Sequence, residues 1–211
     1  MLRFRVVLFS LLALILLVGC NQSNSQANAL PTPATTPIPG WKEIQGGGIA
    51  LWIPNTYEGG ALSGEDRQIL IDRIKALGKD FESTAKLIEN NSDAFLLYAV
   101  DSNTNSQGGT NTINVTTEKV MSVITLDTYL DAASKQFPKQ MSIDSRDIVT
   151  LDGKQAGKLV VEMMSLGVKE VLYVFKSGND IYVITYATGP DDFDKLAADF
   201  ELSAKTFYAK P

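Results

Sequence analysis

"KLVVEMM" at residues 158–164 is the first of three closely spaced stretches that decide the fold of this chain, and "VLYVF" (171–175) and "IYVITYA" (181–187) follow it. Each stretch has apolar residues at consecutive positions, so a strand formed there is apolar on both faces. A strand with one face in water alternates between apolar and polar residues. The three stretches therefore predict a sheet that is covered on both sides.

Turn residues separate these stretches and predict that the strands are antiparallel neighbours. Asp152-Gly153, Gly167 and Gly178-Asn179-Asp180 stand at the boundaries, and such residues favour tight hairpins. The expected strands of this meander span residues 142–151, 155–164, 168–176 and 181–188. Further strands are expected on either side of Gly46-Gly47-Gly48 within residues 41–54, at 94–101 and at 111–120.

Apolar residues at helical spacing predict the remaining elements. A long helix, or two helices with a break near Gly78, is expected over 64–90. A second pattern covers 126–137 with Thr125 as its N-cap, and a last helix begins with Pro190 at its first position. These helices can cover both faces of the sheet. We therefore expect an α+β fold, an antiparallel sheet between helices in an α-β-α sandwich.

The amino-terminal residues have the pattern of a targeting segment. Arg3 and Arg5 precede an apolar run from Val6 to Val18 that only Ser10 interrupts. A membrane span needs about 20 apolar residues, whereas a secretory signal has a cationic start, about 7 to 15 apolar residues and a small-residue exit. The sequence thus predicts a signal peptide.

Leu17-Val18-Gly19-Cys20 resembles the lipobox of bacterial lipoproteins. The resemblance implies that residues 1–19 are removed and that Cys20, the new first residue, carries a diacylglyceryl group and an acylated amino terminus. Two or more chains anchor a protein stably in a membrane, whereas one holds it marginally. An ordinary secretory signal with an incidental cysteine is the alternative. Because Cys20 is the single cysteine, no disulfide is expected.

Residues 20–40 have the composition of a tether, with four prolines among uncharged polar residues. At about 3.1 Å per residue this spacer reaches at most roughly 60 Å from the bilayer. The part after residue 19 has 17 basic and 24 acidic residues, since Arg3 and Arg5 belong to the signal. An acidic surface does not suit nucleic acid or anionic headgroups. We expect lipid to anchor the domain outside the cytoplasm, in a periplasm, a lumen or at a cell surface.

A second resemblance covers residues 41–208. Four stretches carry it: "GWKEIQGGGIALWIP", "TLDTYLDAASKQF", "LDGKQAGKLVVE" and "YVITYATGPDDFDKLAADFELSAKTF". They resemble the PsbP-like domain, which occurs in the extrinsic protein of photosystem II and in bacterial lipoproteins. The resemblance implies a PsbP-like globular domain and a role in binding or assembly. "FESTAKLIENNSDAFLLYAVDS" departs from the photosynthetic member, which argues against a direct photosystem role.

Residue types exclude the catalytic mechanisms that depend on histidine and leave carboxylates, lysine or serine to an enzyme. The chain has no histidine, which removes the commonest general base and metal ligand. Ser83-Thr84-Ala85-Lys86 matches S-x-x-K, but without a K-T-G partner we interpret it as a solvated helix face. No catalytic residue, metal or cofactor is expected.

Two acidic segments have structural explanations. Residues 101–105, "DSNTN", begin like a calcium loop, but Ser106 and Thr112 stand where that loop needs glycine and a bidentate glutamate. A polar turn is the better interpretation. The carboxylates of Asp191, Asp192 and Asp194 follow Pro190, where acids complement the dipole of a helix.

Aromatic residues near the first hairpin are the candidate interface. Trp41, Trp52 and Tyr57, together with Tyr98, are expected to line a surface groove beside a loop at Gly59-Gly60, with core packing as the alternative for each. The sequence thus favours a lipid-anchored binding or assembly module that engages a membrane or envelope protein. The alternative is a small-ligand carrier or a weak carboxylate-based hydrolase with a pocket between sheet and helix.

Overall fold

The computed structural model describes residues 37–210, apart from 63–64, 77, 80–81, 92–94 and 138–139. The signal peptide, Cys20 and most of the tether lie outside the described residues. Two antiparallel sheets are present: a seven-stranded sheet in the order β3-β4-β5-β9-β8-β7-β6 and a three-stranded sheet in the order β1-β2-β10. The α+β class and the antiparallel sheet are confirmed.

The predicted meander forms the centre and one edge of the large sheet. Its strands are β6 (Ser142–Leu151), β7 (Lys154–Met163), β8 (Val168–Ser177) and β9 (Asp180–Thr188). A single 3-10 turn, η3 (Met164–Leu166), separates β7 from β8. Each strand pairs with its sequence neighbour, as the turn residues predicted.

The other edge of the large sheet includes a strand that the sequence did not predict. β4 (Leu97–Thr104) and β5 (Thr110–Lys119) match expected strands, but β3 (Tyr57–Ala61) contains Gly59 and Gly60, which we had read as a loop. A Cβ atom on Gly59 would lie 2.4 Å from the Tyr98 carbonyl oxygen of β4. Glycine is needed there because the two backbones approach closely.

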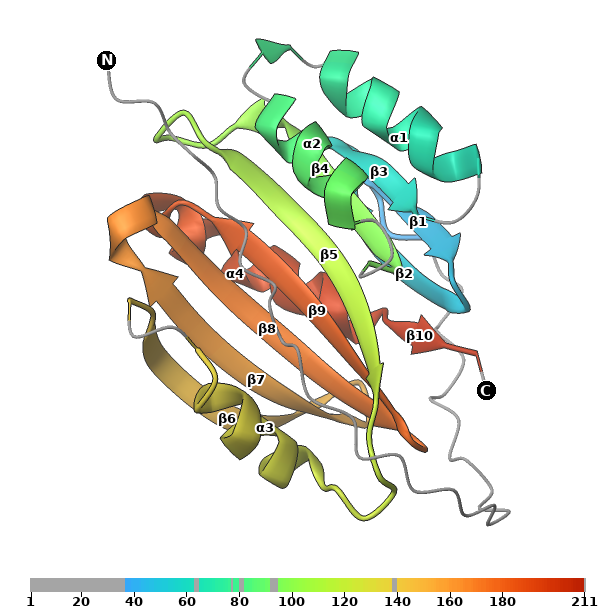
Figure 1. Cartoon of the computed structure of the whole chain (residues 1–211), viewed down its shortest axis with the longest axis vertical. Coiled ribbons are helices and arrows are strands. Elements are labelled where there is room, and N and C mark those ends of the chain that lie inside the picture. The colour runs from blue at the N-terminus through green and yellow to red at the C-terminus, as the bar shows by residue number, and fades with distance from the viewer. Residues whose placement is uncertain are drawn as a thin grey trace.

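Helices lie over the sheet near its two edges and behind its centre (Figure 1). α1 (Glu65–Ala76) and α2 (Glu82–Asn91) are the two helices expected around Gly78. α3 (Leu126–Ser134) begins as predicted, with the Thr125 side chain accepting a hydrogen bond from the Thr128 amide. α4 (Pro190–Lys205) has the predicted proline in its first turn.

The strand register shows which helices cover each face of the large sheet. Tyr98 packs with α1 and α2, and Leu159 of the same face packs with α3. Tyr173 and Tyr186 point to the opposite face, where they pack with Phe200 of α4. Both faces of the central strands therefore bury apolar side chains.

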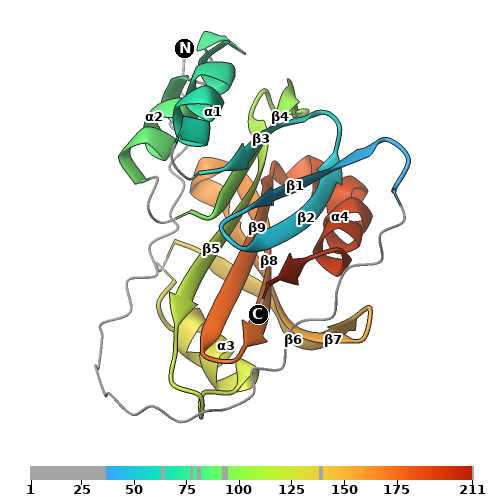
Figure 2. The same ribbon diagram turned by 90° about the vertical axis from the view of Figure 1, so that its right-hand side faces the viewer.

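The α-β-α sandwich prediction was incomplete, because α4 does not cover its face alone. β1 (Trp41–Gly46), β2 (Ile49–Pro54) and β10 (Tyr208–Ala209) form the three-stranded sheet beside α4 (Figure 2). Ile49, Leu51 and Ile53 of β2 are at most 3% exposed and join the same core as α4. A second sheet thus supplies cover that we had assigned to helices.

Candidate functional site

Two of the predicted interface residues share the outer face of the three-stranded sheet. Trp41 is paired with Pro54, and Glu43 is paired with Trp52, so the two tryptophans are diagonal neighbours on one face. Both are half-buried, while the alternate residues of β2 point into the core. Tyr208 of β10 is paired with Ala50 and adds a third half-buried aromatic residue to this face. We call Trp41, Trp52 and Tyr208 the outer aromatic face.

The other two aromatic residues do not line this surface. Tyr57 is 3% exposed, and Tyr98 is 1% exposed and makes an edge-to-face contact with Phe95. The predicted groove of four aromatic residues is therefore wrong for Tyr57 and Tyr98. The sequence could not separate these residues from the tryptophans, because all four lie in or beside short apolar strands.

The carboxyl-terminal end of α4 holds the strand that carries Trp52. The Trp52 amide donates to Thr206 Oγ1 at 2.9 Å, and Ser203 Oγ donates to the Trp52 carbonyl oxygen at 2.6 Å. These hydroxyls satisfy backbone groups of β2 just before β10 takes over the pairing. The outer aromatic face and α4 are thus joined directly.

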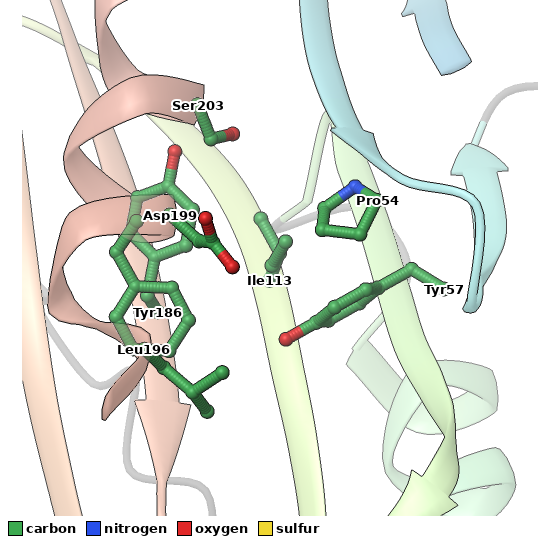
Figure 3. Close-up of a pocket in the computed structure, with 8 residues that line it drawn as sticks. Pro54, Tyr57, Ile113, Tyr186, Leu196, Asp199 and Ser203 are labelled. Carbon is green, nitrogen blue, oxygen red and sulfur yellow. The ribbon is translucent and has the colours of Figure 1, made fainter. Parts of the chain in front are cut away.

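A small pocket lies between α4, β5, β9 and the corner that joins β2 to β3 (Figure 3). It encloses about 20 Å³, and its polar lining comes from Tyr57, Tyr186, Asp199 and Ser203. In Figure 3 the Tyr57 hydroxyl points toward α4, and the Asp199 carboxylate points into the space between them. Tyr57 is thus a pocket residue rather than a surface aromatic.

The two tyrosines present neutral hydroxyls to the pocket. Burial raises the pKa of Tyr57, and the carboxylates of Asp101 and Asp199 raise it further. Burial also raises the pKa of Tyr186 well above its ordinary value. The Tyr186 hydroxyl oxygen is buried and makes no hydrogen bond of normal geometry, and its weak contact with Ser203 offsets only part of the rise in its pKa. Both groups therefore remain able to donate and accept hydrogen bonds at neutral pH.

The acidic segments hold turns and helix ends together. Asp101 accepts from the Asn103 amide at 3.1 Å, but residues 101–104 of the "DSNTN" segment are the end of strand β4. The predicted polar turn is therefore wrong for these four residues, and the turn follows at 105–108, where the Gly108 amide donates to the Asn105 carbonyl oxygen at 3.0 Å. Asp192 accepts from the Ser106 amide at 2.7 Å and pairs with Lys195 at 2.8 Å. The bonds to Lys195 and Ser106 lower the pKa of Asp192 to about 2. The Asp192 carboxylate thus connects the β4–β5 turn to the first turn of α4.

Within the described part of the chain, no three His, Cys, Asp or Glu residues gather as a metal site would require. The Ser83 side chain of the S-x-x-K segment lies outside the described residues. Among the helices that the structure describes, none is both long and apolar enough to cross a bilayer.

Sequence reasoning missed most of the pocket and part of the outer aromatic face. Tyr186, Asp199 and Ser203 come from β9 and α4, and Tyr208 comes from a two-residue strand. None of them belongs to a motif. Their only local signal is the period of α4, which places Asp199 and Ser203 four residues apart on one side of the helix.

Comparisons with known proteins find no matching family model and no matching curated protein. The solved structures that are similar include cyanobacterial PsbP (CyanoP) from Synechocystis sp. PCC 6803, with 12% identity, a TM-score of 0.49, and coverage of 85% of this chain and 98% of that one. LpqN, involved in cell envelope biogenesis of Mycobacterium tuberculosis, has 16% identity, a TM-score of 0.47 and coverage of 85% and 90%. We assign no family and no role from similarities of this size.

Proposed function

We propose that this chain is a lipid-anchored binding or assembly module that works outside the cytoplasm and engages a membrane or envelope protein. Cys20 would hold it to the membrane, and residues 21–40 would let the domain reach its partner. The PsbP-like character of residues 41–208 belongs to the same proposal. The module carries out no catalysis.

One observation carries the proposal: Trp41 and Trp52 are half-buried side by side on the outer face of the small sheet. Aromatic residues on a surface are enriched in protein interfaces, because they bury a large area at little conformational cost. Trp41 is also the first residue after the tether. A partner in the same membrane would therefore meet this face within the reach of the spacer.

The pocket between sheet and helix gives little support to the alternative function, a small-ligand carrier or a carboxylate-based hydrolase. Pockets that hold a small organic ligand are typically about 300 to 1,000 Å³, whereas this pocket encloses about 20 Å³. It also contains a single carboxylate, that of Asp199. Paired carboxylates, as a hydrolase of this kind would need, do not line it.

The test is co-purification of the tagged chain from gently solubilised native membranes, followed by mass spectrometry. We expect a stoichiometric partner whose recovery falls at least about tenfold in Trp41→Thr/Trp52→Thr. Ile148→Thr is the matched control, because Ile148 is an exposed apolar residue on the distant edge strand β6. Cys20→Ala should lower recovery by removing the anchor.

Two results would contradict the proposal. Recovery of the chain alone would show that it has no stable partner. Equal recovery of the partner with the tryptophan variant and with the Ile148→Thr control would show that the outer aromatic face is not the binding surface. Normal processing and unchanged membrane retention of Cys20→Ala would remove the lipid anchor.

A further inference from the structure

The pocket beside α4 contains polar groups that the fold itself does not use. The buried Tyr186 hydroxyl makes no hydrogen bond of normal geometry and has only a weak contact with Ser203, although a buried hydroxyl without a partner costs about 1 to 3 kcal/mol. Asp199 in the same pocket has no ion-pair partner among the described residues, whereas Asp192 and Glu201 of the same helix pair with lysines. Both groups are therefore available to a ligand.

The lining is made of hydrogen-bond acceptors around a negative charge. Asp199 offers a carboxylate, and the hydroxyl oxygens of Tyr57 and Tyr186 can each accept a hydrogen bond. Ser203 Oγ directs its proton to the Trp52 carbonyl oxygen, so its lone pairs can accept from a ligand or from the nearby Tyr186 hydroxyl. A group with several donors and a positive charge complements this set.

The volume limits the size of that group. A space of about 20 Å³ holds about one water-sized group, which an ammonium matches and a planar guanidinium exceeds. Asp199 is exposed, and Leu196 and Pro54 are half-buried, so the pocket reaches solvent at an apolar rim. Methylene groups attached to the ammonium would pack along that rim.

Since Pro54 lines the pocket and is paired with Trp41, the pocket adjoins the outer aromatic face. We infer that the pocket is a recognition site for a primary ammonium, which a lysine side chain of the partner protein inserts between Asp199, Tyr57 and Tyr186. This inference rests on the proposed function for the identity of the partner. The ammonium site itself rests on the pocket alone.

The first experiment titrates the full chain, purified in mild detergent, with n-butylammonium chloride and follows the Leu196 methyl resonances by NMR. We expect saturable shifts, with 1-butanol and tetramethylammonium binding at least about tenfold more weakly, because one lacks the charge and the other exceeds the pocket. Equal binding of 1-butanol would overturn the inference and leave a hydration site.

Two substitutions separate the contributions of charge and hydroxyl. Asp199→Asn keeps the shape and should weaken n-butylammonium binding at least about tenfold. Tyr186→Phe should weaken it about threefold or more with at most a small fall in the unfolding temperature, since the hydroxyl makes no hydrogen bond of normal geometry in the protein. Asp194→Asn is the control, as an exposed acid of the same helix outside the pocket. Unchanged binding by Asp199→Asn would overturn the inference.

Co-purification with Asp199→Asn then distinguishes the two proposals. Loss of the partner comparable to that of the tryptophan variant supports the inserted lysine. Full recovery of the partner with Asp199→Asn, but not with Trp41→Thr/Trp52→Thr, would overturn the inserted lysine and leave the proposed function intact. Absence of any partner together with Asp199-dependent binding of n-butylammonium would overturn the proposed function and support the ammonium site.

Discussion

The two faces of the seven-stranded sheet use the same strands but have different side chains at their centres. On the face that packs against α4, one aligned row across five strands belongs entirely to the apolar core: Ala99, Ile113, Tyr186, Val171 and Val160. On the opposite face, the neighbouring row is apolar at its ends and polar in the middle: Tyr98, Asn114, Thr185, Leu172 and Leu159.

The difference indicates which face holds the fold together. The Asn114 side chain is fully buried, yet neither its oxygen nor its nitrogen has a hydrogen-bond partner. Unpaired buried polar groups subtract from stability. The face toward α4 also holds an unpaired hydroxyl, that of Tyr186, but it has continuous aromatic contacts, including Tyr186 stacked on Phe200. We expect most of the free energy of folding to come from the α4 face.

The largest effect is expected from a substitution in the core between the sheet and α4. Phe200 is 3% exposed, and its ring centroid lies 5.0 Å from that of Tyr186. Phe200→Ala should lower the free energy of unfolding by about 3 to 5 kcal/mol, because it removes apolar contacts and leaves a cavity. Urea unfolding measures this, with Leu202→Ala as the partly exposed control on the same helix. A loss below about 1 kcal/mol would contradict the role of this face.

A smaller loss is expected at the end of α4. The Lys154 ammonium donates to the carbonyl oxygens of Lys205 at 2.6 Å and Phe207 at 2.8 Å, and Lys154 is buried. Lys154→Met keeps the length but leaves both carbonyls without this donor. The free energy of unfolding should fall by about 1 to 3 kcal/mol. Lys158→Met, on the same strand but more exposed, is the control. An equal loss of unfolding free energy in both variants would show that the hydrogen bonds of Lys154 to the end of α4 are not its cause.

The opposite face is expected to make stability depend on pH. Burial raises the pKa of Glu170, on the same face as Asn114, from 4.5 to about 7. Between these values the folded state keeps a proton that the unfolded state has lost, so the free energy of unfolding falls as pH rises. The wild type should lose about 2 kcal/mol more than Glu170→Gln between pH 5 and pH 8.

Unfolding in urea at both pH values measures that difference, and Glu43→Gln is a control because Glu43 is an exposed carboxylate on the small sheet. Parallel pH profiles of wild type and Glu170→Gln would show that the Glu170 carboxyl is ionised in the folded state at a normal pH. The two faces would then not differ in this respect.

The smallest expected effect tests the unpaired amide. Asn114→Val replaces an amide without partners by an apolar side chain that suits a strand, so the free energy of unfolding should stay the same or rise by about 1 kcal/mol. Thermal unfolding measures it. A loss above about 2 kcal/mol would mean that the amide is satisfied by a buried water, and the contrast between the faces would be weaker than we infer.

Local chemistry made much of the fold predictable. Thr125 caps α3 and Pro190 starts α4 because each acts on the backbone within its own turn. Hairpin residues such as Gly153 and Gly178 set the meander in the same way, since their positive φ angles suit tight turns. Gly59 was misread because its reason is a distant strand, β4, and no local pattern reports it.

The sequence could predict only the part of the candidate site that follows from the alternation of side chains along neighbouring strands. Trp41 and Trp52 flank a hairpin, so their shared outer face follows from the register of two neighbouring strands. Tyr57 was assigned to the surface, although it lies in the pocket, because its burial depends on α4, which is more than a hundred residues away in the chain.

The sequence by itself determined most of the elements and the antiparallel meander, because each depends on residues close together in the chain. The lipid anchor at Cys20 remains a prediction of the same local kind. Only the tertiary structure decided that a second sheet joins α4 over one face, and that Tyr57, Tyr186 and Asp199 meet in one pocket. The physical reason is that these contacts arise where elements pack, and packing is set by the summed burial of many side chains rather than by any local pattern.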